Sequence, residues 1–391
     1  MTLHVFNPEH DIALAADLEN FTAPHAGRQL RHDLGFLPVL WAKEGDKVLV
    51  DDLEMAQKNI SRLASRLPQS QCAALLAKAD FLVTGRRFCR SGQTMLQFGL
   101  DGAMVRPEWP GGSGLIVKVD PWGWNRALRA QLQRMGFPLA SMPSDLQLNN
   151  IRSLSHRRLS AAILPRIHQQ LGQWQDQLVG QSWECQSRET VESLLSEWPQ
   201  LVLKAPWSSS GRGLRFVTDL TPQTGWLNNL LKRQGSVMVE PYYNKVKDFG
   251  MEFEAHPDGS VSYLGLSLFH TANGAYTGNL LATESVKLSM INRYLSADLL
   301  LGVQQSLCDL LGHFLKGRYC GPLGVDMMIV AREGSDGFSL HPCVEINLRR
   351  TMGHVALSLG RLVNPDADDE LVRVMRIVYE DNIYKLKIQR L

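Results

Sequence analysis

Residues 201–217 read LVLKAPWSSSGRGLRFV, a stretch in which two apolar runs are separated by small and polar residues. The first apolar run ends at a lysine, Lys204, and the second begins at Leu214. Between them lie three serines and two glycines. The pattern predicts two strands, over 202–206 and 214–218, that are joined by a loop and hold one lysine at the end of the first strand.

A lysine in this setting suits a polyphosphate ligand. The ammonium supplies a point charge, serine hydroxyls and backbone N–H groups supply donors, and glycines let the backbone approach an anion closely. The stretch has neither the GxxxxGK[ST] nor the GxGxxG pattern, so it indicates neither a P-loop nor a dinucleotide-binding turn. The alternative interpretation is a surface hairpin with a solubilising lysine.

A second cluster of polar residues lies on two later strands, GVDMMIV (324–330) and HPCVEINLR (341–349). Residues i and i+2 of a strand share a face, so Glu345, Asn347 and Arg349 project together. If the two strands pair across the turn-rich REGSDG, Asp326 lies beside them. Two carboxylates and an amide oxygen are hard ligands of the kind Mg²⁺ prefers. The alternative is a strand with a solvated polar face.

Composition bounds the class of protein. A chain of 391 residues is long enough for two or three domains, and 44% hydrophobic residues is ordinary for a globular protein. A net charge of +2 gives no argument for nucleic acid or membrane as a partner. The start, MTLHVFNPEHDIALA, carries acidic residues where a secretory signal is basic, and the six cysteines include no CxxC pair. We therefore expect a cytoplasmic protein with reduced thiols, no membrane segment and no structural zinc.

The N-terminal part reads as an open α/β sheet. Strand-like and helical patterns alternate there, which favours this class of sheet. The expected strands are 3–6, 36–42, 47–50, 81–85 and 115–121, and the expected helices are 52–66 and 125–137.

The remainder mixes strands and helices in the manner of an α+β protein. Around PDG, the runs 251–256 and 261–269 predict a hairpin. Further strands are expected at 183–187 and 237–243. Helices are expected at 154–171, 189–197, 224–233 and 289–316, and from Asp368 to the end of the chain.

Four stretches in this order, LVLKAPWSSSGRG, VMVEPYY, GVDMMIV and VEINLRRTMG, resemble the ATP-grasp enzymes over about residues 150–391. The resemblance implies a combined α/β and α+β fold. A Rossmann-like pre-ATP-grasp domain would occupy 1–150, a small subdomain with the phosphate loop 151–240, and a C-terminal subdomain with the metal site 241–391.

The resemblance also implies a role for each matching residue. Lys204 would contact the ATP phosphates, and Arg349 would stabilise charge on the transferring phosphoryl group, so both count as catalytic. The mobile loop over the phosphates would be Ser208, Ser209, Ser210, Gly211 and Gly213. The hinge that reads adenine would be Glu240, Pro241, Tyr242 and Tyr243, with Asp248 a candidate for the ribose. One or two Mg²⁺ ions, with Mn²⁺ as a substitute, would be held by Asp326, Glu345 and Asn347.

This sequence departs from the family pattern at one position. The family often has a further lysine upstream, where this chain reads LSHRRLS. Arginine also grips phosphate, so Arg157 or Arg158 is the expected replacement. The residues do not decide between the two.

The implied reaction joins a carboxylate to an amine. The carboxylate attacks the γ-phosphate of ATP to give an acylphosphate and ADP, and the amine then displaces phosphate. The partners would be a small-molecule or peptide carboxylate and an amine, and family members are often homodimers. The alternatives are an ATP-grasp small-molecule kinase and a non-catalytic, nucleotide-binding regulatory module.

Three stretches are candidates for the substrate site. Asn7, Glu9 and His10 follow the first strand, where α/β sheets present ligand sites, although a turn with a helix cap is the alternative. The second, PWGWN (121–125), is better explained as a packing cluster. The third is a glycine-bearing loop that carries His270, Asn273, Tyr276 and Asn279. Arg350, Thr351 and His354 continue from the metal strand, although a lone histidine such as His354 is more often structural.

Overall fold

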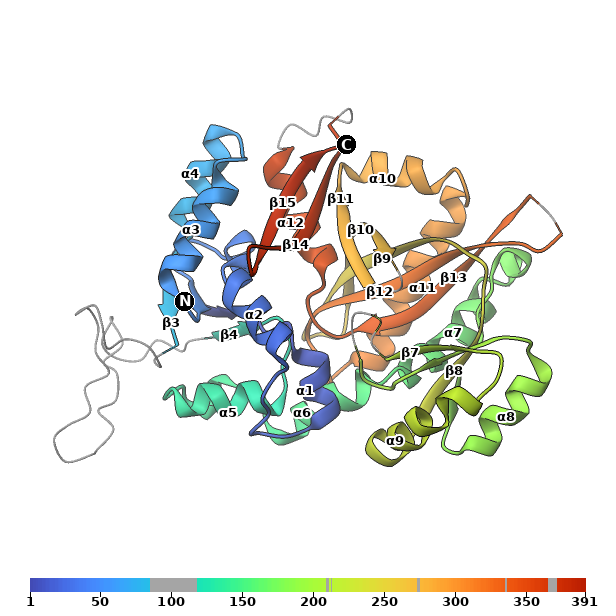
Figure 1. The fold of residues 1–391 in the computed structure, drawn as a ribbon. Helices are drawn as coiled ribbons and strands as arrows, with labels where there is room; N and C mark the ends of the chain where they lie inside the picture. Colours follow the sequence, from blue (N-terminus) through green and yellow to red (C-terminus); the bar gives the residue numbers. More distant parts are fainter. Residues whose placement is uncertain (85–117, 209–210, 212, 273–274, 335, 365–370) are drawn as a thin grey trace. The chain divides into compact units, whose positions relative to one another are not determined.

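The computed structural model describes residues 1–84, 118–208, 211, 213–272, 275–334, 336–364 and 371–391. The chain divides into two compact units (Figure 1). Unit 1 comprises Met1–Leu148 and Val378–Leu386, and unit 2 comprises Asn149–Ile377 and Lys387–Leu391.

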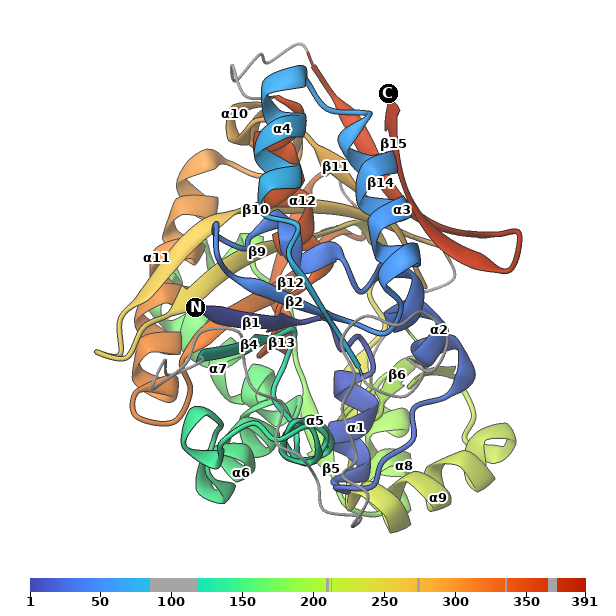
Figure 2. The same cartoon turned by 90° about the vertical axis from the view of Figure 1, so that its left-hand side faces the viewer.

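Unit 1 contains a four-stranded parallel sheet in the order β3-β2-β1-β4. Figure 2 shows β1 between β2 and β4. The strands are β1 (Thr2–Val5), β2 (Lys47–Val50), β3 (Phe81–Val83) and β4 (Lys118–Pro121). Leu3, Val5 and Val119 pack into one core with Leu128 and Leu132 of a following helix. The expected open α/β sheet is therefore confirmed.

The helices of unit 1 include one correction to the sequence analysis. Residues 36–42, expected as a strand, contain the 3₁₀ helix η1, because Pro38 has no N–H for a strand ladder and suits the first turn of a helix. The apolar run reflects burial of the whole turn. The elements are α1 (His10–Ala16), α2 (His25–Leu34), η1 (Leu37–Leu40), α3 (Leu53–Ala64), α4 (Gln69–Ala77), α5 (Arg126–Arg134), η2 (Leu139–Ser141) and α6 (Asp145–Leu154), which runs on into unit 2.

Unit 2 begins with a small antiparallel sheet in the order β5-β8-β6-β7. Its apolar face packs against two helices through residues such as Val191, Leu203, Leu227 and Val239. The elements are β5 (Trp183–Cys185), α8 (Arg188–Glu197), β6 (Leu201–Lys204), β7 (Leu214–Val217), η4 (Thr221–Gln223), α9 (Thr224–Gln234) and β8 (Val237–Pro241).

A seven-stranded sheet in the order β13-β12-β9-β10-β11-β14-β15 contains the remaining strands of unit 2 and the C-terminal hairpin β14–β15, of which residues 378–386 are counted with unit 1. The expected hairpin β9–β10 and the expected pair β12–β13 are both present and antiparallel. The strands are β9 (Lys245–Ala255), β10 (Val261–Ala272), β11 (Ala275–Leu281), β12 (Gly321–Ala331), β13 (Phe338–Asn347), β14 (Arg373–Glu380) and β15 (Ile383–Arg390). The helical elements are α7 (Arg158–Gln170), η3 (Gly172–Gln177), α10 (Glu284–Ile291), α11 (Ala297–Leu315) and α12 (Met352–Val363).

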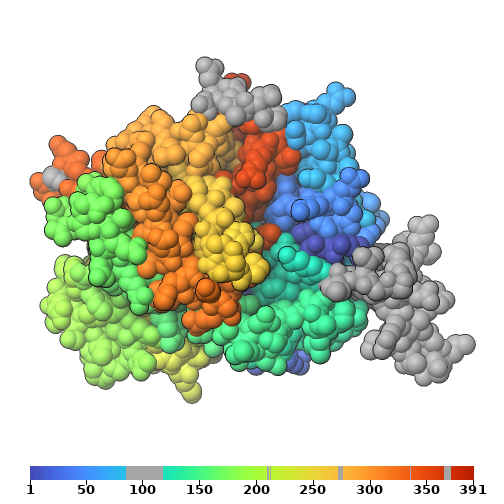
Figure 3. All heavy atoms as spheres, turned by 180° about the vertical axis from the view of Figure 1, so that it is seen from behind, coloured from blue at the N-terminus to red at the C-terminus, as the bar shows by residue number. Residues whose placement is uncertain are grey.

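The two faces of this sheet differ in chemistry. Phe249, Met251 and Phe253 of β9 belong to a large apolar core with residues of α7 and α11. Seen from behind, the segment that contains α10 and α11 forms a broad orange surface (Figure 3). The alternate residues Asp248 and Glu252 point to the opposite face, because side chains alternate along a strand. That second face carries the candidate site.

Two further expectations are wrong. The C-terminal segment is not a helix but the strands β14 and β15, whose turn holds Asp381 and Asn382 at φ of 53° and 61°. Two successive positive φ values are typical of a tight hairpin turn. The helix expected at 289–316 is two helices, because Ser296 caps a new one with its side chain. In the described residues, no helix has the length and apolar character of a membrane span.

Candidate active site

The paired strands β12 and β13 bring the expected acidic residues together. Asp326 lies directly opposite Glu345, and Asn347 lies opposite Gly324. Asn347 Nδ2 donates to Asp326 Oδ2 over 3.1 Å, and Arg349 Nη2 donates to Asn347 Oδ1 over 2.9 Å. Hydrogen bonds thus connect Asp326, Asn347 and Arg349 on the second face of the sheet, and Glu345 lies beside Asp326 on the neighbouring strand.

Crowded negative charge dominates this group. Burial raises the pKa of Asp326 to about 8, with further increases from Glu345 and Glu252 and an opposing decrease from Arg349. A divalent cation would relieve this crowding, and oxygen donors are the ligands that Mg²⁺ accepts. In the part of the chain that the structure describes, no three His, Cys, Asp or Glu side chains form a ready-made metal cage. The residues present therefore fit a Mg²⁺ that takes few protein ligands and completes its shell with phosphate oxygens and water.

The raised pKa of Asp326 gives a pH prediction for metal-free protein. The folded state holds a proton that the unfolded chain releases near its ordinary pKa of about 4. The stabilising contribution is complete below that pH and is lost as the pH rises towards about 8. In EDTA, the free energy of unfolding from urea titrations should show this loss, and Asp326→Asn should remove it. An unchanged pH dependence in Asp326→Asn would contradict the assignment.

Lys204 and Glu240 form a buried ion pair on the small sheet. Lys204 Nζ lies 2.5 Å from Glu240 Oε2, and both side chains are less than one-tenth exposed. Ser182 Oγ donates to Glu240 Oε1 over 3.4 Å. The residue expected to accept from adenine thus has its carboxylate on Lys204 in this structure. Each charge offsets the cost of burying the other.

The rest of the expected hinge lies beside this pair. Pro241 ends β8 opposite Leu201, and Tyr242 N donates to Gln200 O over 3.0 Å. Tyr243 packs edge-on against His341, with ring centroids 5.7 Å apart. Burial, and then the Glu240 charge, raises the pKa of Tyr243 to about 12, so this phenol stays protonated. His341 is fully buried, and burial followed by the Lys204 charge lowers its pKa to about 3.

Arg157, which immediately precedes α7, joins the loop after Lys204 to the acidic cluster. Its Nη2 lies 2.8 Å from both Glu345 Oε1 and Oε2. Its Nη1 donates to Ser208 Oγ over 2.9 Å and to the carbonyl of Ala205. Arg158 points elsewhere: its side chain is 54% exposed and pairs with Glu184 over 3.3 Å. The structure therefore places Arg157, and not Arg158, at the site.

The described part of the loop between β6 and β7 is closely packed. A Cβ added at Gly213 would lie 2.3 Å from Ser208 Oγ, and Gly211 has a φ of +71°. Both positions therefore require glycine. Ser209 and Ser210 lie outside the described residues, as does Asn273.

Asp248, the ribose candidate, lies on the same face of β9 as Glu252. Thr271 Oγ1 donates to Asp248 Oδ2 over 2.6 Å, and Lys245 Nζ lies 2.5 Å from the same oxygen. Thr271 and Lys245 therefore both contact the same carboxylate oxygen of Asp248, Oδ2. Asp248 therefore lies at the end of the face that carries Asp326.

Glu252 belongs to this face and was missed by the sequence analysis. It lies on β9 opposite Gly324, it is 3% exposed, and its charge contributes to the raised pKa of Asp326. His354 Nδ1 lies 3.0 Å from Glu252 Oε2. The available signal was the four-residue spacing from Asp248, which places both acids on one face of a strand.

Glycines make the room for Glu252. A Cβ at Gly353 would lie 1.8 Å from Glu252 Oε1 and 2.5 Å from Ser267 Oγ, whereas a Cβ at Gly360 of the same helix meets nothing within 4 Å. Gly353→Ala should lower the free energy of unfolding by about 2–3 kcal/mol through overpacking. Gly360→Ala, the matched control, should be neutral or raise it by up to about 1 kcal/mol. Equal effects in urea titrations would contradict the close packing.

Two of the substrate-site candidates of unit 2, Tyr276 and Asn279, have side chains that are hydrogen-bonded to other residues of the protein. Tyr276 Oη donates to Asn279 Oδ1 over 2.6 Å, and Asn279 Nδ2 donates to Ser267 Oγ over 2.9 Å. Asn279 is fully buried, and burial raises the pKa of Tyr276. By strand alternation His270 points to the face opposite Ser267 and Thr271. These contacts give Tyr276 and Asn279 a structural role, and a substrate role for the three residues stays a prediction.

The residues that follow β13 lead into α12. Thr351 caps the helix, and the His354 side chain completes a capping box with it. Arg350 supplies its carbonyl to Arg349 Nη1 over 3.1 Å. His354 therefore has the structural role that a lone histidine usually has, and a substrate contact for Arg350 stays a prediction.

The candidates of unit 1 tie two loops together. Asn7 Nδ2 donates to Gly123 O over 2.9 Å, and His10 Nδ1 lies 3.2 Å from Asn125 Nδ2. Glu9 pairs with Arg31 over 3.2 Å. Since Asn7 and His10 are almost completely buried, these contacts account for their polarity. These contacts do not test a substrate role for Asn7, Glu9 and His10, which stays a prediction.

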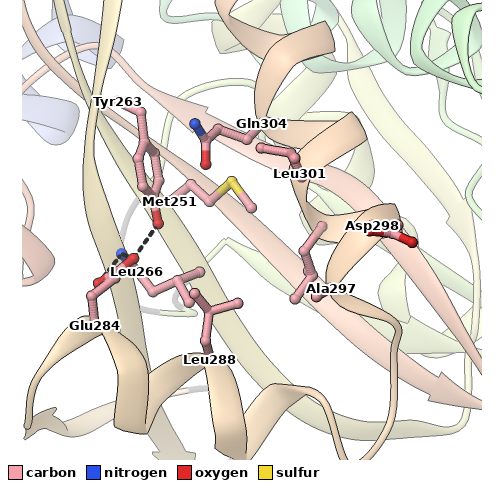
Figure 4. Close-up of a pocket in the computed structure, with 10 residues that line it drawn as sticks. Met251, Tyr263, Leu266, Glu284, Leu288, Ala297, Asp298, Leu301 and Gln304 are labelled. Atoms are coloured by element: carbon pink, nitrogen blue, oxygen red, sulfur yellow. Dashed lines mark hydrogen bonds between the residues drawn. The ribbon is translucent and has the colours of Figure 1, made fainter.

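A pocket of about 290 Å³ lies on the opposite, apolar face of the large sheet, between that face and α10 and α11 (Figure 4). Its lining is mainly apolar. Glu284 at its edge accepts from Tyr263 Oη over 2.5 Å and from Leu266 N over 2.9 Å. Glu284 and Asp298 are the charged residues in this lining, and the Glu284 carboxylate is already engaged by those donors.

No protein-family model matches the chain, and no curated protein matches it. Similar solved structures include N5-carboxyaminoimidazole synthetase from Staphylococcus aureus complexed with ADP, at 10% identity over 97% of this chain and 83% of that one, with a TM-score of 0.49. Biotin carboxylase from Campylobacter jejuni matches at 12% identity over 68% and 61%, with a TM-score of 0.44. L-amino acid ligase from Bacillus licheniformis matches at 12% identity over 67% and 61%, with a TM-score of 0.38.

At these identities and TM-scores, the matches assign neither a reaction nor a substrate to the chain. The fold class that the ATP-grasp resemblance implied is confirmed by the strand order itself: a parallel α/β sheet is followed by two antiparallel sheets.

Proposed function

We propose that the protein is an ATP- and Mg²⁺-dependent ligase of the ATP-grasp type, which joins a carboxylate to an amine and releases ADP and phosphate. One observation carries the proposal. Arg157 links the loop after Lys204 to the acidic cluster of β12 and β13, so cationic phosphate-binding groups and oxygen ligands for a metal lie in one unit.

In this proposal the small sheet supplies the phosphate-binding residues and the large sheet supplies the metal ligands. From the small sheet, Lys204 and the Ser208 loop bind phosphate oxygens, and the hinge from Glu240 to Tyr243 lies beside them. From the large sheet, Asp326, Glu345 and Asn347 would hold Mg²⁺, which when bound neutralises charge on the phosphates. Arg349 stands next to Asn347 and supplies a fixed positive charge for the transferring phosphoryl group.

This chemistry needs no nucleophile from the enzyme. The substrate carboxylate attacks the γ-phosphate of ATP and ADP leaves, and the amine then attacks the carbonyl carbon of the acylphosphate and displaces phosphate. The chain's own contribution is positioning and charge neutralisation, which accounts for most phosphoryl-transfer catalysis. We also propose a cytoplasmic location, one or two Mg²⁺ ions and a small-molecule or peptide carboxylate as substrate.

The test is release of ADP and phosphate from Mg-ATP in the presence of pooled carboxylates, with and without pooled amines. The proposal expects both products only when both pools are present, and splitting the pools then identifies the substrates. ADP without free phosphate from one pool alone would overturn the ligase in favour of a kinase. No release from any pool, together with a nucleotide-induced rise in melting temperature, would favour a binding module.

A further inference from the structure

Both terminal nitrogens of the Arg157 guanidinium are hydrogen-bonded within the candidate site. It is 7% exposed, and its Nη2 spans both oxygens of Glu345 at 2.8 Å each. The same guanidinium contacts Ser208 through Oγ over 2.9 Å and through the carbonyl over 3.3 Å. Its backbone N–H donates to Pro206 O over 3.3 Å. One buried cation therefore connects the phosphate loop and a metal-ligand candidate.

This arrangement gives Glu345 a partner that competes with a metal. Both carboxylate oxygens face one positive charge, and a divalent cation must displace that charge to use them. Breaking this largely buried pair would leave the Arg157 charge uncompensated, which is unfavourable unless a new partner is supplied. A divalent cation alone cannot replace Glu345 as the ion-pair partner of Arg157, because the cation and the guanidinium have the same sign of charge.

A polyphosphate does offer Arg157 a new partner. Arginine binds phosphate oxygens well, and the guanidinium already touches the loop that follows Lys204. Moving from Glu345 to a phosphate would keep Arg157 paired while it frees both carboxylate oxygens. Nucleotide binding and metal binding would then favour each other by the same factor, as linkage requires.

We propose that Arg157 acts as a latch: it occupies Glu345 while no nucleotide is bound, so that a divalent cation binds weakly at Asp326, Glu345 and Asn347 until the nucleotide binds. The inference rests on the proposed function and concerns the regulation of the same site. Arg157 is in this respect a positioning residue, which acts through Glu345.

The experiment measures binding of Mn²⁺ alone, as free Mn²⁺ in electron paramagnetic resonance titrations, without nucleotide. Removing the latch in Arg157→Gln should tighten nucleotide-free Mn²⁺ binding by about tenfold. Arg158→Gln, the matched control on the neighbouring exposed arginine, should bind Mn²⁺ like the wild type. The double variant Arg157→Gln/Glu345→Gln should lose the gain. Unchanged or weaker Mn²⁺ binding in Arg157→Gln would overturn the latch.

A second variant protects the test against misfolding. Arg157→Lys keeps the charge but loses the planar guanidinium, so it should give a smaller gain in Mn²⁺ affinity in the same direction. If Arg157→Gln does not fold, as judged by its melting curve, the lysine variant decides: no gain overturns the proposal.

A parallel titration with ADP separates this inference from the proposed function. In the wild type, ADP should tighten Mn²⁺ binding, and this coupling should shrink in Arg157→Gln because its latch is already open. Wild-type protein that binds no ADP at all contradicts the proposed function. A coupling of equal size in wild type and Arg157→Gln contradicts the latch alone.

Discussion

Glu345→Gln is expected to lower ATP turnover by about 10³-fold or more while the fold persists. The substitution removes the negative charge that would hold Mg²⁺ opposite Asp326. Metal stabilisation of a phosphoryl transition state is worth several kcal/mol, and each 1.36 kcal/mol is tenfold in rate. The measurement is steady-state ADP release with the substrates identified from the pools, at saturating Mg-ATP.

Two controls make this result interpretable. Glu333→Gln changes an exposed acid at the turn of the same β12–β13 hairpin and should leave turnover unchanged. The melting curve of Glu345→Gln shows whether the loss of the Arg157 partner has unfolded the protein, since Gln keeps only one acceptor oxygen for that guanidinium. Full activity in folded Glu345→Gln would contradict the metal assignment.

Lys204→Met is expected to lower turnover by about 10²–10³-fold, the effect of removing one preorganised charge from a transition state. The methionine keeps the length and apolar body of the side chain but leaves Glu240 buried without its cation. The measurement is again the rate of ADP release, together with the KM for ATP, which should rise.

The buried partner needs its own control. In Lys204→Met/Glu240→Gln no uncompensated charge remains, so this variant should regain thermal stability but not turnover. Lys232→Met, on an exposed lysine of α9, should match the wild type in both. Turnover restored by Glu240→Gln would show that Lys204 acts by neutralising Glu240 and not by binding phosphate.

Elements with a clear period could be predicted from the sequence. The hairpin around PDG and the pair that joins Asp326 to Glu345 follow from strand alternation and turn residues, both of which are local properties. The same kind of signal exists for the C-terminal hairpin, because Asp381 and Asn382 suit a positive φ, and it outweighs the helical pattern that predicts a helix from Asp368 onward. At 36–42 an apolar run was read as a strand, although Pro38 argued against it.

The site is only partly a local property. That Glu345 and Asn347 share a face with Asp326 follows from spacing. The choice of Arg157 over Arg158 depends on which guanidinium meets the Ser208 loop, a contact across 51 residues of sequence. Glu252 entered the site only because Gly324 and Gly353, far apart in the sequence, leave room for its carboxylate. Such packing has no signature in one stretch of chain.

The most direct test of the account is calorimetric titration of the protein with ADP, with and without Mg²⁺, in wild type and Lys204→Met. The account predicts one ADP site per chain, tighter binding with Mg²⁺, and weaker ADP binding in Lys204→Met. Absence of ADP binding in folded wild-type protein, or equal affinity in the two proteins, would contradict the claim that Lys204 and the acidic cluster form a nucleotide site.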